Sequence, residues 1–210
     1  GGHRVKKSLS IIAFLLLASC APTHNNDDNS TPQKPLEKEG VTFKISTFNV
    51  KWFGIGGTMW NRPENEFRQS ILRHFVEQEL KTSDLIGFVV VVEVQTLRDM
   101  LAGLYECVSY EARWSRHQHV VLCYDPKKYR AEKYDEDYVI HEVNLGSGGL
   151  RPALQAKICH KQGECFLQVL GLHLVAGAKS EKRFRQIKKL RDALIHDSHP
   201  LPTLAYGDFN

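Results

Sequence analysis

The chain has 210 residues, enough for one sizeable domain with a short appendage. Its hydrophobic content of 42% and charged content of 25% are those of an ordinary soluble globular protein rather than a fibrous or low-complexity one. The net charge of +4 would help to bind phosphates, but many proteins without such a partner carry the same charge, so it identifies no ligand.

The first twenty residues are typical of a secretory signal peptide. Arg4, Lys6 and Lys7 precede the apolar run LSIIAFLLLA, which is much shorter than the ~20 residues of a membrane-spanning helix. The run ends in LASC, which resembles the lipobox of bacterial lipoproteins and implies lipidation at Cys20. An ordinary signal peptide with a chance cysteine is the alternative. We expect an exported, membrane-anchored lipoprotein that faces the periplasm or the cell exterior.

Residues 21–40 are polar and rich in Asn, Asp and Pro, which predicts a disordered tether. Residues 41–210 remain for the folded domain. Export would place the other four cysteines in an oxidising compartment, where three pairings are open. Cys159 and Cys165 flank one short turn, and Cys107 and Cys123 flank another predicted hairpin. The chain has no CxxC pair, so a zinc site is not expected.

Two periodicities define the elements of the domain. Alternation of apolar residues begins at 41–45, and helical spacing of apolar residues marks 63–80 and 180–197, where Phe184, Ile187, Leu190 and Leu194 share a face opposite basic residues. In chain order we expect a strand at 41–50, a helix at 63–80, a buried strand at 84–94, a short helix at 96–106, strands around 107–114, 118–125, 134–143, 153–159 and 165–174, a helix at 180–197 and a strand at 202–208. This order predicts an α+β sandwich rather than a doubly wound parallel sheet.

Polar side chains fall at the ends of these strands, where a scaffold can hold them over a cleft. They are Asn49, Glu93, Arg151, His173, Asp208 and Asn210. Carboxylate and amide oxygens suit Mg²⁺, an Asp can orient a water, and Arg or His can stabilise the charge that develops on phosphorus. The set therefore suits hydrolysis of a phosphodiester.

Each residue also has a structural explanation when taken singly. Glu93 could simply end a strand at the solvent, His173 could be a hydrogen-bonded core histidine, and Arg151 could be a surface residue. The letters GDFN could form a turn. Only the joint order of the residues favours the functional interpretation.

That joint order resembles the endonuclease/exonuclease/phosphatase family, which includes deoxyribonuclease I. The matching pieces are ISTFNV, DLIGFVVVVEV, HVVLCYDPKKY, LRPALQAKI, LGLHLVAG, KRFRQIKKLRDAL and LAYGDFN, which follow one another in the family's order across residues 43–210. The resemblance implies a four-layer α/β sandwich, with two mixed sheets face to face and helices outside.

The resemblance also implies roles for the strand-end residues. Glu93 matches the family's Mg²⁺ ligand, and Asn49 matches the asparagine that helps to organise metal and phosphate; Mn²⁺ and Ca²⁺ are alternative ions. Asp208 matches the residue that orients or deprotonates the attacking water, with Asn210 as its partner. His173 matches a histidine that contacts the scissile phosphate, and Arg151 a phosphate-contacting arginine.

The chain departs from the family in two places. Val92 stands where the family has Gln before the metal ligand, and the stretch from Asp84 to Glu93 is longer than usual. The family's last motif, an Asp–His pair downstream of GDFN, is missing. We therefore expect an incomplete domain, inactive and poorly stable as a 210-residue species.

The favoured function is a Mg²⁺-dependent phosphodiesterase, most simply a nuclease acting on DNA or RNA. A phospholipid or sphingomyelin phosphodiesterase, or a phosphatase, is the alternative within the family. A non-catalytic surface-binding lipoprotein is the alternative outside it. The expected partners are nucleic acid and, through Cys20, a membrane; no protein partner is indicated.

Overall fold

The computed structural model describes residues 43–54, 65–110, 118–134, 136–146, 150–195 and 201–210, which belong to one compact unit, Val41–Asn210. The expected signal peptide, Cys20 and the tether lie outside the described residues. The helices are α1 (Asn65–Phe75), a π-helical turn η2 (Val76–Leu80), α2 (Val94–Leu101), a 3₁₀ turn η3 (His141–Asn144) and α3 (Ser180–Ile195). The strands are β1 (Ile45–Phe53), β2 (Leu85–Val91), β3 (Glu106–Val108), β4 (His119–Tyr124), β5 (Tyr129–Glu132), β6 (Val139–Ile140), β7 (Ala153–His160), β8 (Cys165–His173) and β9 (Thr203–Asp208).

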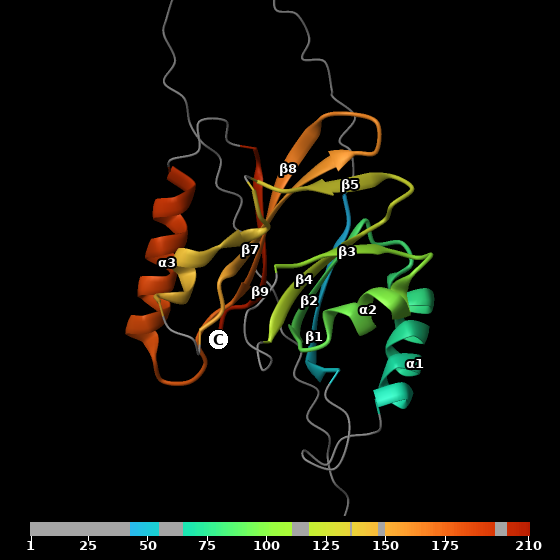
Figure 1. The fold of residues 1–210 in the computed structure, drawn as a ribbon, viewed down its shortest axis with the longest axis horizontal. Coiled ribbons are helices and arrows are strands. Elements are labelled where there is room, and N and C mark those ends of the chain that lie inside the picture. Colours follow the sequence, from blue (N-terminus) through green and yellow to red (C-terminus); the bar gives the residue numbers. More distant parts are fainter. Residues whose placement is uncertain (1–42, 55–64, 111–117, 135, 147–149, 196–200) are drawn as a thin grey trace, which may run out of the picture. The chain divides into compact units, whose positions relative to one another are not determined.

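The described strands form two mixed sheets. The first has the order β1-β2-β4-β3, with β1 and β2 parallel, and the second has the order β5-β7-β8-β9, with β8 and β9 parallel and β6 added to β7. Figure 1 shows α3 outside the second sheet and α1 and α2 outside the first, with the two sheets facing each other between them. This arrangement confirms the predicted α+β, four-layer sandwich. Among the described helices, none is long and apolar enough to cross a membrane.

The all-apolar sequence of β2 follows from its position in the middle of these layers. Every residue of β2 is buried, because helices cover one face of the strand and the second sheet covers the other. Burial of each large side chain contributes roughly 1.5–3 kcal/mol.

Tyr206 of β9 fixes the position of the second sheet against the first. A Cβ atom on Gly87 would lie 2.2 Å from the Tyr206 ring, and one on Gly171 would lie 2.7 Å from the Tyr206 hydroxyl, so both glycines are needed for this close approach. The buried Tyr206 hydroxyl donates a hydrogen bond to the carbonyl of Val121 on β4 (2.9 Å). This contact ties β9, which ends at Asp208, to β4 of the first sheet.

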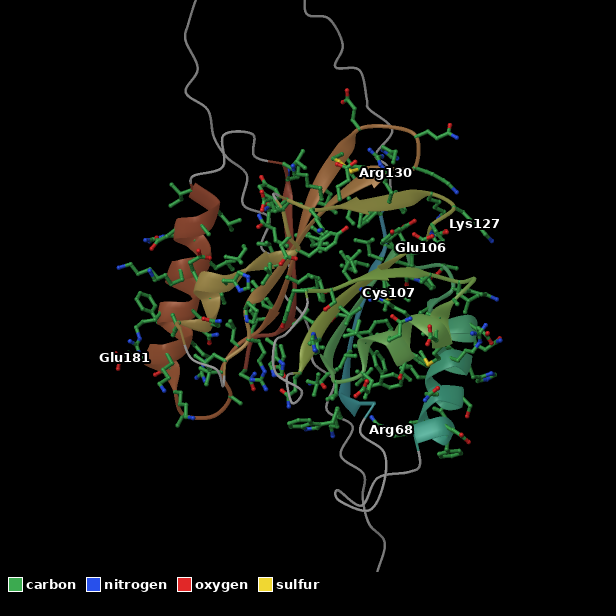
Figure 2. All side chains as sticks on the ribbon, viewed as in Figure 1. Arg68, Glu106, Cys107, Lys127, Arg130 and Glu181 are labelled. Atoms are coloured by element: carbon green, nitrogen blue, oxygen red, sulfur yellow. A yellow bond between two sulfur atoms is a disulfide. The ribbon has the colours of Figure 1, made fainter. Side chains whose placement is uncertain are left out.

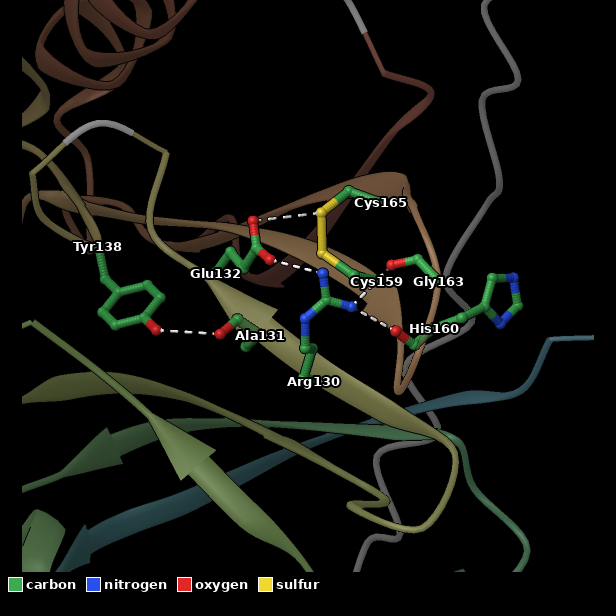
Figure 3. Close-up of a disulfide and its surroundings, with 8 residues drawn as sticks. All are labelled: Arg130, Ala131, Glu132, Tyr138, Cys159, His160, Gly163 and Cys165. Carbon is green, nitrogen blue, oxygen red and sulfur yellow. Dashed lines mark hydrogen bonds and ion pairs between the residues drawn. A yellow bond between two sulfur atoms is a disulfide. The ribbon is translucent and has the colours of Figure 1, made fainter.

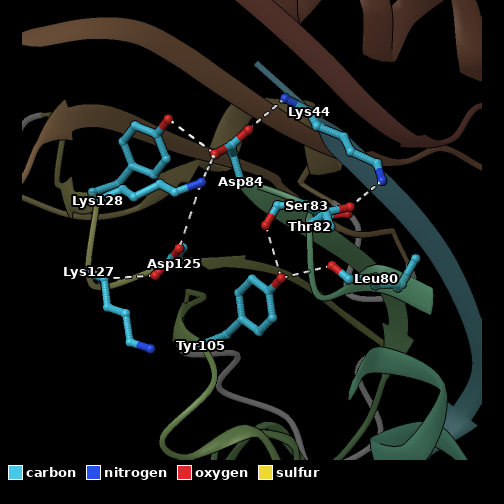
Figure 4. Close-up of polar contacts among 10 residues, drawn as sticks. Lys44, Leu80, Thr82, Ser83, Asp84, Tyr105, Asp125, Lys127 and Lys128 are labelled. Atoms are coloured by element: carbon cyan, nitrogen blue, oxygen red, sulfur yellow. Dashed lines mark hydrogen bonds and ion pairs between the residues drawn. The ribbon is translucent and has the colours of Figure 1, made fainter. Parts of the chain in front are cut away.

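A buried carboxylate ties the start of β2 to its surroundings (Figure 4). Asp84 accepts hydrogen bonds from the backbone N–H of Lys44 (2.8 Å), the ammonium of Lys128 (2.9 Å) and the hydroxyl of Tyr129 (3.2 Å). Burial alone would raise the pKa of Asp84, but the hydrogen bonds from Lys44 and Lys128 hold it below its ordinary value. Asp84 therefore has a structural role, because its carboxylate oxygens already accept hydrogen bonds from three neighbouring residues.

Both expected cysteine pairs are disulfide-bonded. Cys107 on β3, labelled in Figure 2, pairs with Cys123 directly across on β4, and Cys159 on β7 pairs with Cys165 directly across on β8. Figure 3 shows the second disulfide beside Arg130, which donates to the carbonyl of Gly163 (2.8 Å) and forms an ion pair with Glu132 (2.7 Å). Arg130 thus joins β5 to the β7–β8 hairpin.

Three sequence expectations need correction. Residues 134–143 are mostly not a strand: only β6 is extended, and η3 follows it at once. The short strand β5 was not expected, since four residues give too little alternation to detect. In α3 the expected apolar face is divided, because Leu190 is buried while Phe184 is 70% exposed and Ile187 is 40% exposed. Of the expected strand at 107–114, residues 111–114 lie outside the described part.

Candidate active site

The two sheets meet at a hydrogen bond between Asn49 and Asp208. Asn49 lies in β1 and Asp208 is the last residue of β9, and the Asn49 Nδ2 donates to Asp208 Oδ2 over 3.3 Å. The Oδ1 of Asn49 in turn accepts from the backbone N–H of Lys51 (3.0 Å), an Asx-type turn that orients the amide. The structure therefore brings two of the predicted residues into contact.

Asn210 completes a turn at the end of β9. Its backbone N–H donates to Asp208 Oδ1 (3.0 Å), and its side-chain Nδ2 donates to the carbonyl of Leu174 (3.0 Å). Its backbone has a φ of 49°, a left-handed conformation that Asn adopts more easily than most residues. Both carboxylate oxygens of Asp208 thus accept a hydrogen bond, which fixes the orientation of the carboxylate at the end of β9.

His173 lies beside Asp208 on the neighbouring strand. β8 and β9 run parallel with His173 directly paired to Asp208, so the two side chains share a face of the sheet. Burial and the nearby Arg151 lower the pKa of His173 to about 4, while Asp208 partly opposes this shift. The imidazole is therefore neutral at neutral pH, and within the described part of the chain its buried Nδ1 has no hydrogen-bond partner.

Arg151 supplies a positive charge to the same region. Its guanidinium donates to the Oε1 of Gln118, which is 6% exposed. Burial lowers the pKa of Arg151, whereas Tyr110 and Asp208 raise it, and an arginine remains charged in either case. The site thus combines a cation, a neutral imidazole and a carboxylate.

Glu93 stands apart from these residues. Between Asn49 and Phe53 the pairing of β1 with β2 shifts register, with left-handed backbone at Lys51, Trp52 and Val90. The backbone N–H of Glu93 donates to the carbonyl of Phe53 (3.3 Å), four residues beyond Asn49. Among the described residues, no hydrogen bond or ion pair joins the exposed Glu93 carboxylate to another side chain.

Gly54 makes room for Glu93 at this position. A Cβ atom on Gly54 would lie 2.4 Å from the Glu93 Cβ, and Gly54 has a φ of +97°, which side chains rarely adopt. The glycine therefore allows the end of β1 to pack directly on Glu93. The long spacing from Asp84 to Glu93, noted in the sequence, includes an irregularity at Val90, where two steps along β2 lie opposite one step along β4.

The donor set fits a hard divalent cation with retained water. Glu93 offers carboxylate oxygens and Asn49 offers an amide oxygen, ligand types that Mg²⁺ prefers. Across the described residues, the one group of three His, Cys, Asp or Glu ligand atoms within 4.8 Å is Glu132, Cys159 and Cys165, whose sulfurs form a disulfide. A metal at the candidate site would thus bind few protein ligands and keep several waters.

Sequence reasoning missed Gln118 and Tyr110. Gln118 immediately precedes β4 and is buried where it accepts from Arg151, and the buried Tyr110 interacts electrostatically with the same arginine. A single Gln between two His residues carries no periodic signal, and Tyr110 reads as an ordinary core aromatic. Only the tertiary arrangement identifies them.

Comparison with known proteins establishes the fold. No protein-family model and no curated protein sequence matches the chain. Among solved structures, an endonuclease/exonuclease/phosphatase family protein from Bacteroides thetaiotaomicron is similar with a TM-score of 0.59 and 16% identity, over 80% of this chain and 63% of that one. A Bacteroides thetaiotaomicron mannosyl-6-phosphatase gives 0.58 and 16%, over 80% and 66%.

Danio rerio TDP2 in complex with a single-stranded DNA product is a third similar structure, with a TM-score of 0.57 and 16% identity, over 80% of this chain and 60% of that one. The chain thus spans less than two thirds of the length of each of these three structures. Their shared architecture shows that the chain has the endonuclease/exonuclease/phosphatase fold.

Proposed function

We propose that this chain, which has the endonuclease/exonuclease/phosphatase fold, belongs to that family and hydrolyses phosphodiesters with a divalent metal ion. The observation that carries the proposal is the contact between Asn49 and Asp208, with His173 and Arg151 beside it. A core position could explain His173 alone, and a turn could explain Asp208 alone. Neither explains why Asn, Asp, His and Arg side chains come together where the two sheets meet. Their convergence supports a catalytic site.

The side chains have distinct proposed roles. Asp208, held by Asn49 and Asn210, orients a water molecule and draws its proton toward Oδ1 or Oδ2. His173, neutral at neutral pH, offers a ring nitrogen to a phosphate oxygen or to the departing oxygen. Arg151 stabilises the negative charge that accumulates on the phosphate.

Glu93 and Asn49 would hold the metal ion, with Mg²⁺ as the preferred ion and Mn²⁺ or Ca²⁺ as alternatives. When bound, such an ion draws charge from the phosphate oxygens. Glu93 is exposed and has no competing partner among the described residues, so its side chain is free to turn toward a metal.

Nucleic acid is the favoured substrate. TDP2, which has the same fold, is seen in complex with a single-stranded DNA product. The similar mannosyl-6-phosphatase supports a phosphatase as the second candidate. A lipid phosphodiesterase and a non-catalytic binding protein remain as the further alternatives.

The first test uses the full-length gene product. It should nick supercoiled plasmid in the presence of Mg²⁺, lose this activity in EDTA, and act faster on DNA than on sphingomyelin or mannose 6-phosphate. Preference for mannose 6-phosphate would replace the nuclease assignment by the phosphatase. Absence of Mg²⁺ binding by calorimetry, together with no hydrolysis of the three substrates, would favour the binding protein.

We further propose export and lipid anchoring at Cys20, which rest on the LASC motif alone. The expected mature protein carries diacylglycerol on Cys20, and mass spectrometry of the membrane fraction would detect it. Recovery of a Cys20→Ser variant in the same lipid-modified form would contradict the assignment.

A further inference from the structure

Helix α3 is held in a fixed orientation by its inner face. The buried side chain of Gln186 accepts from the backbone N–H of Val175 (3.0 Å) and donates to the carbonyl of Val143 (3.1 Å). Arg183 donates to the carbonyl of Val175 (3.1 Å), and Leu190 packs into the core. Because both polar and apolar contacts fix this face, the opposite side of the helix has a defined direction.

The outer side of α3 carries an apolar stripe. Phe184 is 70% exposed, Ile187 is 40% exposed and Ile195 is 66% exposed. Ile187 follows Phe184 by three residues and precedes Ile195 by eight, spacings that place all three side chains on one side of a helix. Large apolar side chains gathered on an exposed stripe commonly mark an interaction surface.

Basic residues flank this stripe. Between Ser180 and Ile195 the helix has six Lys or Arg residues and two acidic ones, Glu181 and Asp192. Lys188 and Arg191 lie within one turn of the stripe, and Lys189 extends the charge around the helix. Figure 1 shows α3 as the outermost layer on its side of the second sheet, and Figure 2 shows its side chains projecting outward around Glu181.

We propose that this face of α3 docks on an anionic phospholipid surface. Phe184 and Ile195 would enter the boundary between headgroups and acyl chains, while Lys188 and Lys189 pair with lipid phosphates. The proposal rests neither on the hydrolytic function nor on lipidation of Cys20. If Cys20 is anchored as proposed, α3 provides a second contact that orients the domain.

Charge complementarity favours a lipid surface over the other occupants. Two copies of this chain would bring two positive helices together, which opposes self-association through this face. A nucleic acid would satisfy the lysines, but its phosphate backbone offers little to three exposed apolar side chains. An anionic bilayer satisfies both the charge and the apolar stripe.

The test measures sedimentation of the Cys20→Ser full-length chain with vesicles. Binding to equal parts of phosphatidylglycerol and phosphatidylcholine should exceed binding to phosphatidylcholine alone. Replacing both Phe184 and Ile195 by Ser should lower the partition coefficient by about tenfold, as expected for loss of two partly inserted side chains. Lys188→Gln with Lys189→Gln should lower it by about tenfold as well.

The matched control is Phe67→Ser with Ile71→Ser on α1, where the two side chains are 58% and 53% exposed without a comparable basic flank. This pair should leave vesicle binding unchanged. Vesicle binding by the Phe184→Ser, Ile195→Ser variant that equals vesicle binding by the wild type would overturn the proposal. So would self-association that is lost in the α3 variant, or DNA binding through Lys188 and Lys189 without vesicle binding. If the serine variant fails the circular-dichroism check for folding, the lysine variant alone decides.

Discussion

Asn49 and Asp208, separated by 159 positions in the sequence and carried by different sheets, meet in a 3.3 Å hydrogen bond. The bond depends on how the two sheets are aligned, which Tyr206 fixes through Gly87 and Gly171. The geometry of the candidate site is therefore set by the core of the sandwich, because β9 cannot shift without displacing the tyrosine.

Replacing Asn49 by Ala should reduce phosphodiester hydrolysis by the full-length gene product about 100-fold, the usual cost of one preorganised donor. The free energy of unfolding should change by less than about 1 kcal/mol, since Asn49 is exposed. Initial rates on plasmid DNA and urea unfolding measure the two quantities. Gln95→Ala, which removes an exposed amide bonded to Asp99, is the control and should leave the rate unchanged. An unaffected rate in Asn49→Ala would remove Asn49 from the site.

Gly54→Ala should weaken Mg²⁺ binding by about tenfold, or ~1.4 kcal/mol, because the new methyl group would displace Glu93. Calorimetric titration of the full-length gene product gives the affinity. Gly103→Ala is the matched control, since Gly103 also has a positive φ, of +82°, but nothing lies within 4 Å of its Cβ position. Both variants should lose roughly 1–3 kcal/mol of stability through backbone strain. Equal Mg²⁺ affinity in both would show that the position of Glu93 does not matter for the metal.

Acidification should destabilise the domain through His173. Its pKa of about 4 in the folded state lies below the ordinary value of 6.5, so the unfolded chain binds a proton first. The free energy of unfolding should therefore fall as the pH drops from about 6.5 toward 4, by up to roughly 3 kcal/mol from this residue. Below about pH 4 the folded and the unfolded chain both bind the proton, so the destabilisation that arises from His173 is complete and does not grow further.

Urea unfolding between pH 7 and pH 4 measures this slope. His173→Gln should flatten it, and His74→Gln, at an exposed position on α1, should not. A slope that is the same in wild type and His173→Gln would mean that His173 titrates normally in the folded protein.

The two disulfides should contribute unequally to stability. They join residues 16 and 6 positions apart, so chain entropy assigns about 3 kcal/mol to Cys107–Cys123 and about 2 kcal/mol to Cys159–Cys165. Paired Cys→Ser variants and urea unfolding at neutral pH measure both losses. A larger loss for Cys159–Cys165 would show that contacts around Arg130 outweigh loop length.

The order of helices and strands was sufficient to predict an α+β sandwich, and the family resemblance supplied its four layers and the candidate site residues. His173 and Asp208 end their strands as expected, and the parallel pairing of β8 with β9 brings them together. Asn49, expected at the end of the first strand, instead lies in the middle of β1, which continues to Phe53. Glu93 was harder to place, since the register shift between β1 and β2 moves it along the sheet relative to Asn49. No local pattern indicates such a shift.

Helix orientation and isolated polar residues were also beyond local patterns. The apolar residues of α3 span a wide arc, and periodicity alone does not tell whether Phe184 or Gln186 faces the sheet. The buried Gln186 faces the sheet because its side chain forms hydrogen bonds with the backbone of Val175 and Val143, which come near it only in the folded chain. Gln118 is identified in the same way, through its contact with Arg151.

The most direct test of a hydrolytic site at Asp208 is the single-turnover rate of Mg²⁺-dependent DNA cleavage by the full-length gene product and its Asp208→Asn variant. The asparagine keeps the shape of the side chain but removes the charge that orients water, so the rate should fall by about 10³-fold or more while folding and DNA binding persist. Asp99→Asn, at an exposed position on α2, should cleave at the wild-type rate. Cleavage by Asp208→Asn at the rate of Asp99→Asn would contradict the assignment of this site.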